Sequence, residues 1–174
     1  GIGVALKHYA CNSVETARRW RSSEVAEDVM REIYLRAFEI ACRAEPMTVM
    51  SSYNLVNGVR MAENRRLFDI LRREFGFDGM IMSDWEVVQD VRRSLNAGLD
   101  WEMPYHAGHA AERRKLLAEG QLDLQALDAS VARVVAMAEK VRENRRRRRV
   151  ETSVEERIAF SQRVEENAIV LLKN

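Results

Sequence analysis

The sequence predicts an α/β fold in which short strands alternate with helices around a parallel sheet. Short apolar runs recur along the first hundred or so residues, and an amphipathic stretch with helical spacing follows each of them. Tyr53 and Asp84, which close two of these runs, lie roughly 30 residues apart in the chain, and this is the length of one βα unit. No Gly-x-Gly-x-x-Gly motif follows a run, so a dinucleotide-binding fold lacks its fingerprint.

Composition narrows the classes of protein that the chain can belong to. Its 174 residues, 47% hydrophobic and 32% charged, are enough for a globular domain with a real core. Lys and Arg number 28 against 27 Asp and Glu, so no strong field attracts nucleic acid or an acidic membrane surface. Neither nucleic acid nor a membrane is therefore expected as a partner. No signal peptide is expected in this segment, because Lys7 and His8 interrupt the first apolar run, and a cytoplasmic or secreted location both stay open.

The first predicted unit begins with a strand at Val4–Leu6 and continues through an arginine-rich loop into a helix. Ser22 or Ser23 is predicted to cap that helix, and Pro46 marks that it has ended. Apolar residues at intervals of four predict its buried face: Val25, Val29, Ile33, Ala37 and Ala41.

The second unit begins with a strand at Thr48–Met50, which is followed by an Asn57-Gly58 turn. Asn64 is predicted to cap the next helix, and Gly76 suits its C-terminal end. The face that this helix buries should carry Leu67, Ile70 and Leu71.

The third strand is predicted at Met80–Met82 and ends at Ser83-Asp84-Trp85. A helix should follow with Val87, Val88, Val91 and Leu95 on one side. Gly98–Pro104 then predicts a fourth short strand and its exit. About four βα units make half of a TIM-type (β/α)8 barrel, whose chemistry lies where the strands end.

The remainder of the chain is predicted to be helical. A long helix carries an apolar stripe from Leu124 to Val141, and the arginine run Arg145–Arg149 that follows is interpreted as a solvated helix end or linker. Ser153 and Glu156 fit a capping box for a last helix, and Ile169–Leu172 is interpreted as strand-like.

Asp84 is the leading candidate for chemistry because its carboxylate lies at a predicted strand end. Such a group can attack an electrophilic carbon if nearby donors keep it ionised, and Trp85 could form one wall of a sugar site. The spacing alone leaves a second interpretation open, in which Asp84 caps the following helix.

Lys7 and His8 would bring hydrogen-bond donors to a neighbouring strand end, where they could bind vicinal hydroxyls. Lys7 could instead form a Schiff base, as in a lyase, or pair with a carboxylate. Tyr53 could hydrogen-bond the attacking carboxylate, although the residues alone favour an aromatic at the edge of the core.

Asp100 and Glu102 alternate with apolar residues and are expected to share a strand face. If that face is buried they need partners such as Lys7 or Arg18, which favours structural ion pairs over catalysis. His106 and His109 are interpreted as surface residues, because no further ligands surround them, and no metal or other cofactor is expected.

Taken in order, several motifs resemble glycoside hydrolase family 3, the β-glucosidase-like enzymes. They are "KHYACNSVETARR", "REIYLRAFEIACR", "VMSSYNLVNG", "LRREFGFDGMIMSDW", "AGLDWEMP" and "VEENAIVLLKN". The resemblance runs over most of the chain. It implies that Asp84 is the nucleophile of a retaining β-glycosidase that acts on β-linked glucosides or oligosaccharides.

The resemblance also implies roles for five other residues. Lys7, His8 and Arg18 would bind hydroxyls of the sugar, Tyr53 would support the nucleophile and Trp85 would line the sugar site. The N-acetylglucosaminidase branch of the family carries Pro-Gly-His just after the Lys-His pair. This chain has Ala10-Cys11-Asn12 there, which places it on the glucosidase or xylosidase side.

The same resemblance implies that residues 1–122 are the second half of the catalytic barrel and that residues 123–174 are a helical linker towards an absent second domain. The absent parts would supply further sugar-binding residues and the acid/base glutamate. We therefore expect this polypeptide alone to be feebly active or inactive. Its open sheet edges would invite the missing half or a second copy to dock. The alternative is a non-catalytic half-barrel scaffold or sugar-binding module, which could be a dimer.

Overall fold

The main sheet contains four strands that are all parallel. The computed structural model describes residues 2–146 and 151–173. The strands are β1 (Ala5–Tyr9), β3 (Thr48–Ser51), β6 (Met80–Trp85) and β7 (Trp101–Met103), and they lie side by side in chain order. This confirms the predicted α/β fold with a parallel sheet.

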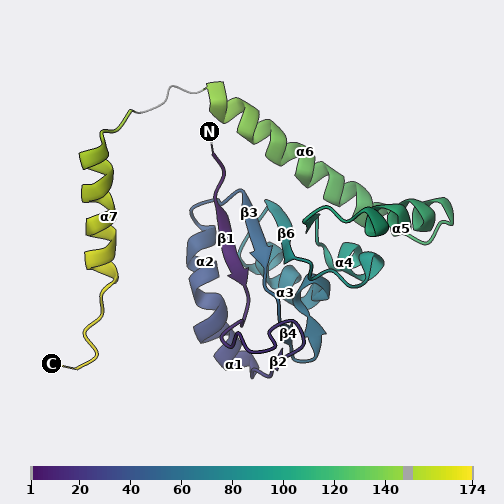
Figure 1. Ribbon diagram of the computed structural model, residues 1–174, viewed down its shortest axis with the longest axis horizontal. Coiled ribbons are helices and arrows are strands. Elements are labelled where there is room, and N and C mark those ends of the chain that lie inside the picture. The colour runs from purple at the N-terminus through teal and green to yellow at the C-terminus, as the bar shows by residue number, and fades with distance from the viewer. Residues whose placement is uncertain (1, 147–150, 174) are drawn as a thin grey trace.

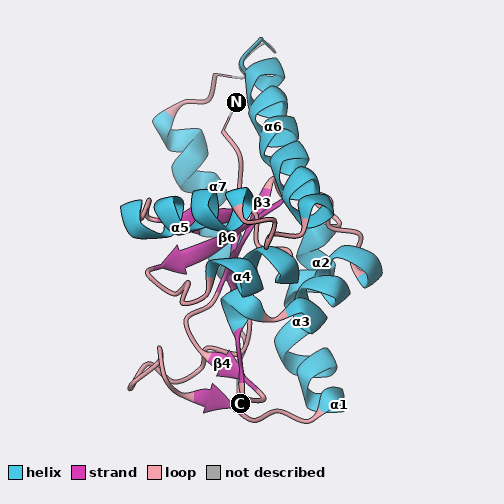
Figure 2. Ribbon diagram, turned by 90° about the vertical axis from the view of Figure 1, so that its right-hand side faces the viewer, coloured by secondary structure: helices cyan, strands magenta, loops and turns pink. Residues whose placement is uncertain are grey.

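Helices α2 (Arg36–Cys42), α3 (Arg65–Asp69) and α4 (Val91–Ala97) lie on one side of this sheet (Figure 2). Val49 and Ile81, which are opposite each other in β3 and β6, have no exposed surface. Their neighbours Met50 and Met82 point to the other face and are half-buried. The hydrophobic core therefore lies on the helical side of the sheet.

The first helix departs from the predicted pattern. It runs from α1 (Glu27–Val29) through a π-helical stretch, η1 (Met30–Leu35), into α2. Met30 and Leu35 are fully buried, whereas Ile33 is 66% exposed. The predicted face from Val25 to Ala41 is wrong because π-helical turns replace the i, i+4 spacing with i, i+5.

The predicted serine cap of that helix is also wrong. Ala26 precedes the helix and makes no side-chain cap. Ser22 and Ser23 instead form a short strand, β2, which pairs in parallel with β4 (Leu55–Val56). The Ser23 hydroxyl donates to the carbonyl of Cys11 at 2.8 Å. The serines therefore fix the loop after β1 rather than the helix.

The turn at Asn57-Gly58 is confirmed. It joins β4 to the antiparallel strand β5 (Val59–Arg60), and φ is 48° at Asn57 and 80° at Gly58. Positive φ at both positions is typical of a type I′ hairpin. The three short strands form a second small sheet below the arrow of β1 in Figure 1.

The predicted caps of the second helix are confirmed. After a short 3₁₀ turn, η2 (Met61–Glu63), the Asn64 side chain accepts a hydrogen bond from the Leu67 amide at 3.1 Å. The helix continues from α3 into η3 (Ile70–Glu74), and Gly76 follows with a φ of 69°. Leu67, Ile70 and Leu71 are buried as predicted.

The third helix starts later than predicted. Val87 and Val88 are buried but precede α4, which begins at Val91. Asp90 sets this start, because its carboxylate accepts a hydrogen bond from the Arg93 amide at 2.8 Å.

The C-terminal part contains α5 (Ala107–Ala118), α6 (Leu124–Arg146) and α7 (Val154–Ala168). The capping box of Ser153 and Glu156 is confirmed. In Figure 1, α7 stands apart from the sheet, and it has no buried residue. No helix in the described ranges is long and apolar enough to cross a membrane.

Two predictions for this part need correction. The stripe on α6 is only partly covered, since Leu124, Val131 and Val135 are at least half exposed. Ile169–Leu172 is exposed and forms no strand. Of the arginine run, Arg145 and Arg146 end α6, and positions 147–149 lie outside the described residues.

Candidate active site

Asp84 lies near the carboxyl end of β6, at the edge where all four parallel strands end. It is only 4% exposed. One carboxylate oxygen, Oδ1, accepts a hydrogen bond from the Trp85 amide at 2.7 Å. The next helix is capped by Asp90, so the structure excludes the alternative in which Asp84 caps it.

The other oxygen of Asp84, Oδ2, is buried and accepts no hydrogen bond from the described residues. His8 Nε2, from the end of β1, lies 3.2 Å from it. Buried polar atoms are nearly always hydrogen-bonded, so an exception in a native fold calls for an explanation. A carboxylate with one open, buried oxygen beside an imidazole can act as a nucleophile or a base.

Tyr53, which follows β3, is almost fully buried at 8% exposure. Burial and the neighbouring Asp84 carboxylate both raise the pKa of the Tyr53 phenol. The phenol therefore stays protonated at neutral pH, and it is available to donate a hydrogen bond to Asp84.

Arg18 completes this group from the loop after β1. Its guanidinium carbon lies 3.7 Å from the centroid of the Tyr53 ring, which is a cation–π contact. One Arg18 nitrogen donates to the Glu15 carboxylate at 2.6 Å. Arg18 thus lies against Tyr53, with its position fixed from two sides.

Two other predicted site residues are more exposed. Trp85 follows Asp84 and is 54% exposed. Lys7 is exposed on β1, and it makes no ion pair or hydrogen bond within the described part of the chain. The structure thus brings together Asp84, His8, Tyr53 and Arg18, with Trp85 next to Asp84 and Lys7 next to His8 on β1.

Polar side chains hold the strand ends in place. The Ser52 hydroxyl donates to the Ala10 carbonyl at 2.8 Å, and the Asn54 amide donates to the Cys11 carbonyl at 3.2 Å. The Ser83 hydroxyl accepts from the Met103 amide at 2.8 Å. These bonds connect the exits of β1, β3, β6 and β7, and so they fix the backbone that carries the site.

Asp100 has the predicted structural role but not the predicted partners. Its side chain is fully buried and pairs with Arg72 and Arg133, each at 2.7 Å, rather than with Lys7 or Arg18. Burial lowers the pKa of Arg72, and the charge of Asp100 opposes that shift. Arg133 lies on α6, so this cluster ties α6 to the sheet.

Glu102 also pairs within its own region, with His109 Nδ1 at 2.5 Å and Arg113 at 2.6 Å. The interpretation of His109 as a surface residue is therefore wrong, since its side chain is only 21% exposed. Its ring lies against that of His106, 4.2 Å between centroids, and His106 caps α5. Among the described residues, no cluster of potential ligands is arranged to hold a metal ion.

Sequence reasoning missed two residues at the site. Arg19 pairs with Glu86 at 3.1 Å, which joins the loop after β1 to the exit of β6. Glu86 has a φ of 60°, an unusual value for a residue other than glycine. The sequence carries no local signal for this pairing or for this backbone conformation.

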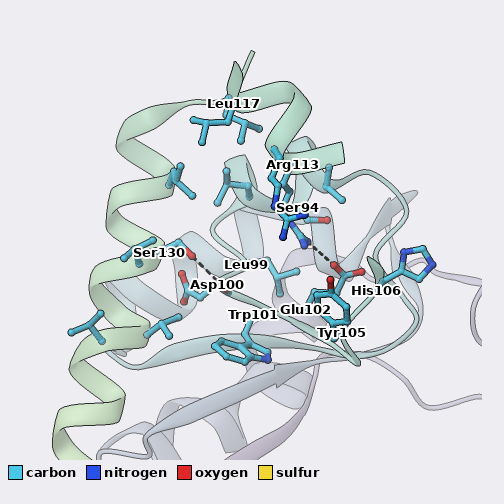
Figure 3. Close-up of a pocket in the computed structure, with 18 residues that line it drawn as sticks. Ser94, Leu99, Asp100, Trp101, Glu102, Tyr105, His106, Arg113, Leu117 and Ser130 are labelled. Carbon is cyan, nitrogen blue, oxygen red and sulfur yellow. Dashed lines mark hydrogen bonds and ion pairs between the residues drawn. The ribbon is translucent and has the colours of Figure 1, made fainter. Parts of the chain in front are cut away.

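A cavity of about 480 Å³ lies elsewhere, between α4, α5, α6 and β7 (Figure 3). Its walls are mainly apolar side chains such as Leu99 and Leu117, and its polar lining includes Asp100, Glu102 and Arg113 from the ion pairs described above. None of the predicted site residues lines it. The chemistry therefore points to the strand ends and not to this cavity.

The fold and the site define an α/β protein with a parallel sheet and a buried carboxylate at the carboxyl edge of that sheet. Residues 1–137 match the model of the glycosyl hydrolase family 3 N-terminal domain. The chain belongs to this family.

Curated relatives agree with this assignment. An exo-α-(1→6)-L-arabinopyranosidase from Bifidobacterium longum is 50% identical over 106 residues, which cover 60% of this chain and 14% of that protein. A β-glucosidase from Rhizobium radiobacter is 42% identical over 147 residues, which cover 81% of this chain and 18% of that protein. The chain thus spans less than a fifth of the length of these relatives.

Solved structures show the same likeness. A family 3 β-glucosidase from Bifidobacterium adolescentis superposes with a TM-score of 0.86 at 36% identity, covering 99% of this chain and 26% of that one. β-Glucosidase 3B from Thermotoga neapolitana, in complex with glucose, gives 0.72 at 37% identity and covers 76% of this chain and 20% of that one. These matches agree with the family assignment.

Proposed function

We propose that these residues form part of a retaining β-glycosidase in which Asp84 is the nucleophile. Asp84 Oδ2 attacks the anomeric carbon, and the bond to the leaving-group oxygen breaks as that oxygen takes a proton from an acid/base carboxyl. Water, deprotonated by the same carboxyl, then cleaves the glycosyl ester and restores the Asp84 carboxylate.

The observation that carries this proposal is the state of the Asp84 carboxylate. One oxygen is occupied by the Trp85 amide, and the other is buried, accepts no hydrogen bond from the described residues and lies 3.2 Å from His8 Nε2. A nucleophile needs a free lone pair and neighbours that keep it ionised. His8 Nε2 lies 3.2 Å from the open oxygen, and the Tyr53 phenol is available to donate a hydrogen bond to the carboxylate.

The remaining predicted residues bind the sugar in this proposal. Lys7, His8 and Arg18 donate hydrogen bonds to its hydroxyls, and the exposed Trp85 ring forms an apolar wall against it. The substrate is the non-reducing end of a β-linked glucoside or oligosaccharide. Because one relative is named for an α-L-arabinopyranoside, that sugar is a second substrate to test.

We further propose that the acid/base carboxyl and half of the barrel come from parts of the enzyme outside residues 1–174. The parallel strands follow chain order, as consecutive strands of a barrel do, and the chain spans only 26% of the Bifidobacterium adolescentis enzyme. The missing half would dock at the edge strands β1 and β7. This polypeptide alone is then feebly active or inactive, and it can self-associate through the same edges.

Trapping of the glycosyl ester tests the assignment. A 2-deoxy-2-fluoro-β-glucoside with a good leaving group should label the complete enzyme on the peptide that contains Asp84, as measured by digestion and mass spectrometry. Asp84→Asn should abolish the label, and the Asp90→Asn control should retain it, because Asn caps a helix as well as Asp does. A label on another carboxylate would refute the role of Asp84.

Two further outcomes would point to other functions. Borohydride trapping of a carbonyl substrate on Lys7 would indicate a lyase. Glucose binding in calorimetry, with neither label nor turnover in the complete polypeptide, would indicate a non-catalytic sugar-binding module.

A further inference from the structure

Arg19 and Glu86 form an ion pair beside the Asp84 site that the proposed mechanism does not use. We propose that this pair positions Arg18 and Tyr53 for substrate binding, an inference that rests on the proposed function. The pair acts through the loop that carries Arg18 and touches no reacting atom, so both members are positioning residues.

The pair connects two segments that are anchored separately. On one side, the Arg19 carbonyl accepts a hydrogen bond from Arg60 of β5 at 3.0 Å. On the other, the Glu86 amide donates to the Met103 carbonyl of β7 at 3.0 Å. The contact between Arg19 Nη2 and Glu86 Oε2, at 3.1 Å, is therefore a bridge from the loop after β1 to the exit of β6.

This bridge lies next to the residues that it would position. The Arg19 guanidinium carbon is 5.6 Å from the centroid of the Tyr53 ring, on which Arg18 stacks at 3.7 Å. Arg18 precedes Arg19 in the chain, so fixing Arg19 limits the movement of Arg18. Tyr53 in turn adjoins Asp84, whose charge contributes to the raised pKa of the phenol.

Fold stability does not explain a glutamate at position 86. Its φ of 60° lies in the left-handed region, where glycine is less strained than any residue with a Cβ. The side chains of Arg19 and Glu86 are 42% and 62% exposed, and exposed ion pairs contribute little to stability. An unfavourable backbone conformation kept beside a reactive carboxylate favours a role in function.

Loss of the bridge should weaken substrate binding more than the chemical step. Arg18 is proposed to bind a hydroxyl in the ground state, so its release raises KM. Asp84 is held by β6 and by the Trp85 amide, so the nucleophile itself stays in place. This split between KM and kcat distinguishes a positioning pair from a general structural contact.

The test uses the complete enzyme with a β-glucoside substrate. Arg19→Gln and Glu86→Gln should each raise KM about two- to five-fold, the range for one exposed ion pair, with kcat changed less than about two-fold. The charge-swapped double variant, Arg19→Glu with Glu86→Arg, should recover KM. The matched control is Arg36→Gln, which removes an exposed pair with Glu39 on α2 and should leave KM unchanged.

Glu86→Gly separates the backbone effect from the side-chain effect. It should raise Tm, because it relieves the left-handed strain, and raise KM as Glu86→Gln does. The inference is overturned if the single variants keep KM unchanged. It is also overturned if the KM of the charge-swapped double variant is no lower than the two single changes together would give. If the 2-deoxy-2-fluoro-β-glucoside labels Asp84 of the wild-type enzyme, either of these results leaves the proposed function intact. If the wild-type enzyme is not labelled, the proposed function itself is refuted.

Discussion

Two aspartates on neighbouring strand segments, Asp84 and Asp100, show how the same side chain is used in opposite ways. Asp100 is fully buried, and its carboxylate accepts from Arg72, from Arg133 and from the Ile81 amide at 2.7, 2.7 and 2.8 Å. Asp84 is nearly as buried, but one of its oxygens accepts no hydrogen bond from the described residues.

The difference bears on what separates a structural carboxylate from the nucleophile that we propose. A buried charge is tolerated when paired cations and amides replace the water that it has lost. Asp100 meets that condition with both oxygens, so neither oxygen is left open for chemistry. Asp84 meets it with one oxygen, and the other remains open beside His8. The number of satisfied oxygens, rather than burial, distinguishes the two regions.

The largest expected effect is the loss of activity in Asp84→Asn. If the open oxygen is the nucleophile, kcat of the complete enzyme on a β-glucoside should fall on the order of 10⁴-fold, as for removal of other nucleophiles and bases. Tm should stay the same or rise, because a partly unsatisfied buried charge is removed. Steady-state kinetics and a thermal melt measure both, with Asp90→Asn as the control. A variant that keeps activity would remove the contrast with Asp100.

Asp100→Asn should have the opposite profile and a smaller effect. It leaves Arg72 and Arg133 near a neutral amide, and breaking a buried ion pair costs about 3–5 kcal/mol of stability. Urea unfolding measures this loss. Asp69→Asn is the matched control, because its pairs with Arg65 and Arg73 are exposed and should contribute about 0–1 kcal/mol. Equal losses in the two variants would contradict the structural role of Asp100.

Glu102 offers an intermediate case. Both of its oxygens are paired, with His109 and Arg113, but these partners are 21% and 36% exposed. Solvent can partly replace the lost interactions, so Glu102→Gln should destabilise the fold by about 1–3 kcal/mol, less than Asp100→Asn does. Urea unfolding of the two variants side by side checks this order. A larger loss for Glu102→Gln would show that burial of the partners does not set the cost.

Much of the fold could be predicted because its signals are local. The Asn64 cap, the Asn57-Gly58 turn and the Ser153 capping box each depend on residues a few positions apart, and the structure contains all three. The strand that carries Asp84, β6, is predicted for the same reason: an apolar run, Met80–Met82, stops at polar residues.

Features that depend on contacts between distant residues could not be predicted. The partners of Asp100 lie 28 and 33 residues away in the chain, and nothing near Asp100 marks them. The π-helical turns at Met30–Leu35 shift the buried face, although the sequence has an i, i+4 pattern. For the site, Lys7, His8, Tyr53, Asp84 and Trp85 were proposed from the strand ends and Arg18 from the family resemblance. The open oxygen of Asp84 and the Arg19 bridge exist only in three dimensions.

A smaller effect than that of Asp84→Asn is expected for Tyr53→Phe, which tests whether the neighbours of Asp84 act on it. Loss of one hydrogen-bond donor to the nucleophile should lower kcat/KM about ten-fold.

The raised pKa of Tyr53 also has a consequence for stability. The folded protein holds the phenol proton more tightly than the unfolded chain, which releases it near pH 10. Tyr53 therefore makes its full contribution to the free energy of unfolding below about pH 10. This contribution is lost as the pH rises towards the pKa of the phenol in the folded protein. Urea unfolding at pH 8 and above pH 10 should show a steeper decline in wild type than in Tyr53→Phe, where the raised pKa values of Tyr9 and Cys11 still contribute. An equal decline in both would mean that neither burial nor Asp84 perturbs this phenol, and the contrast between the two aspartates would then rest on the open oxygen and His8 alone.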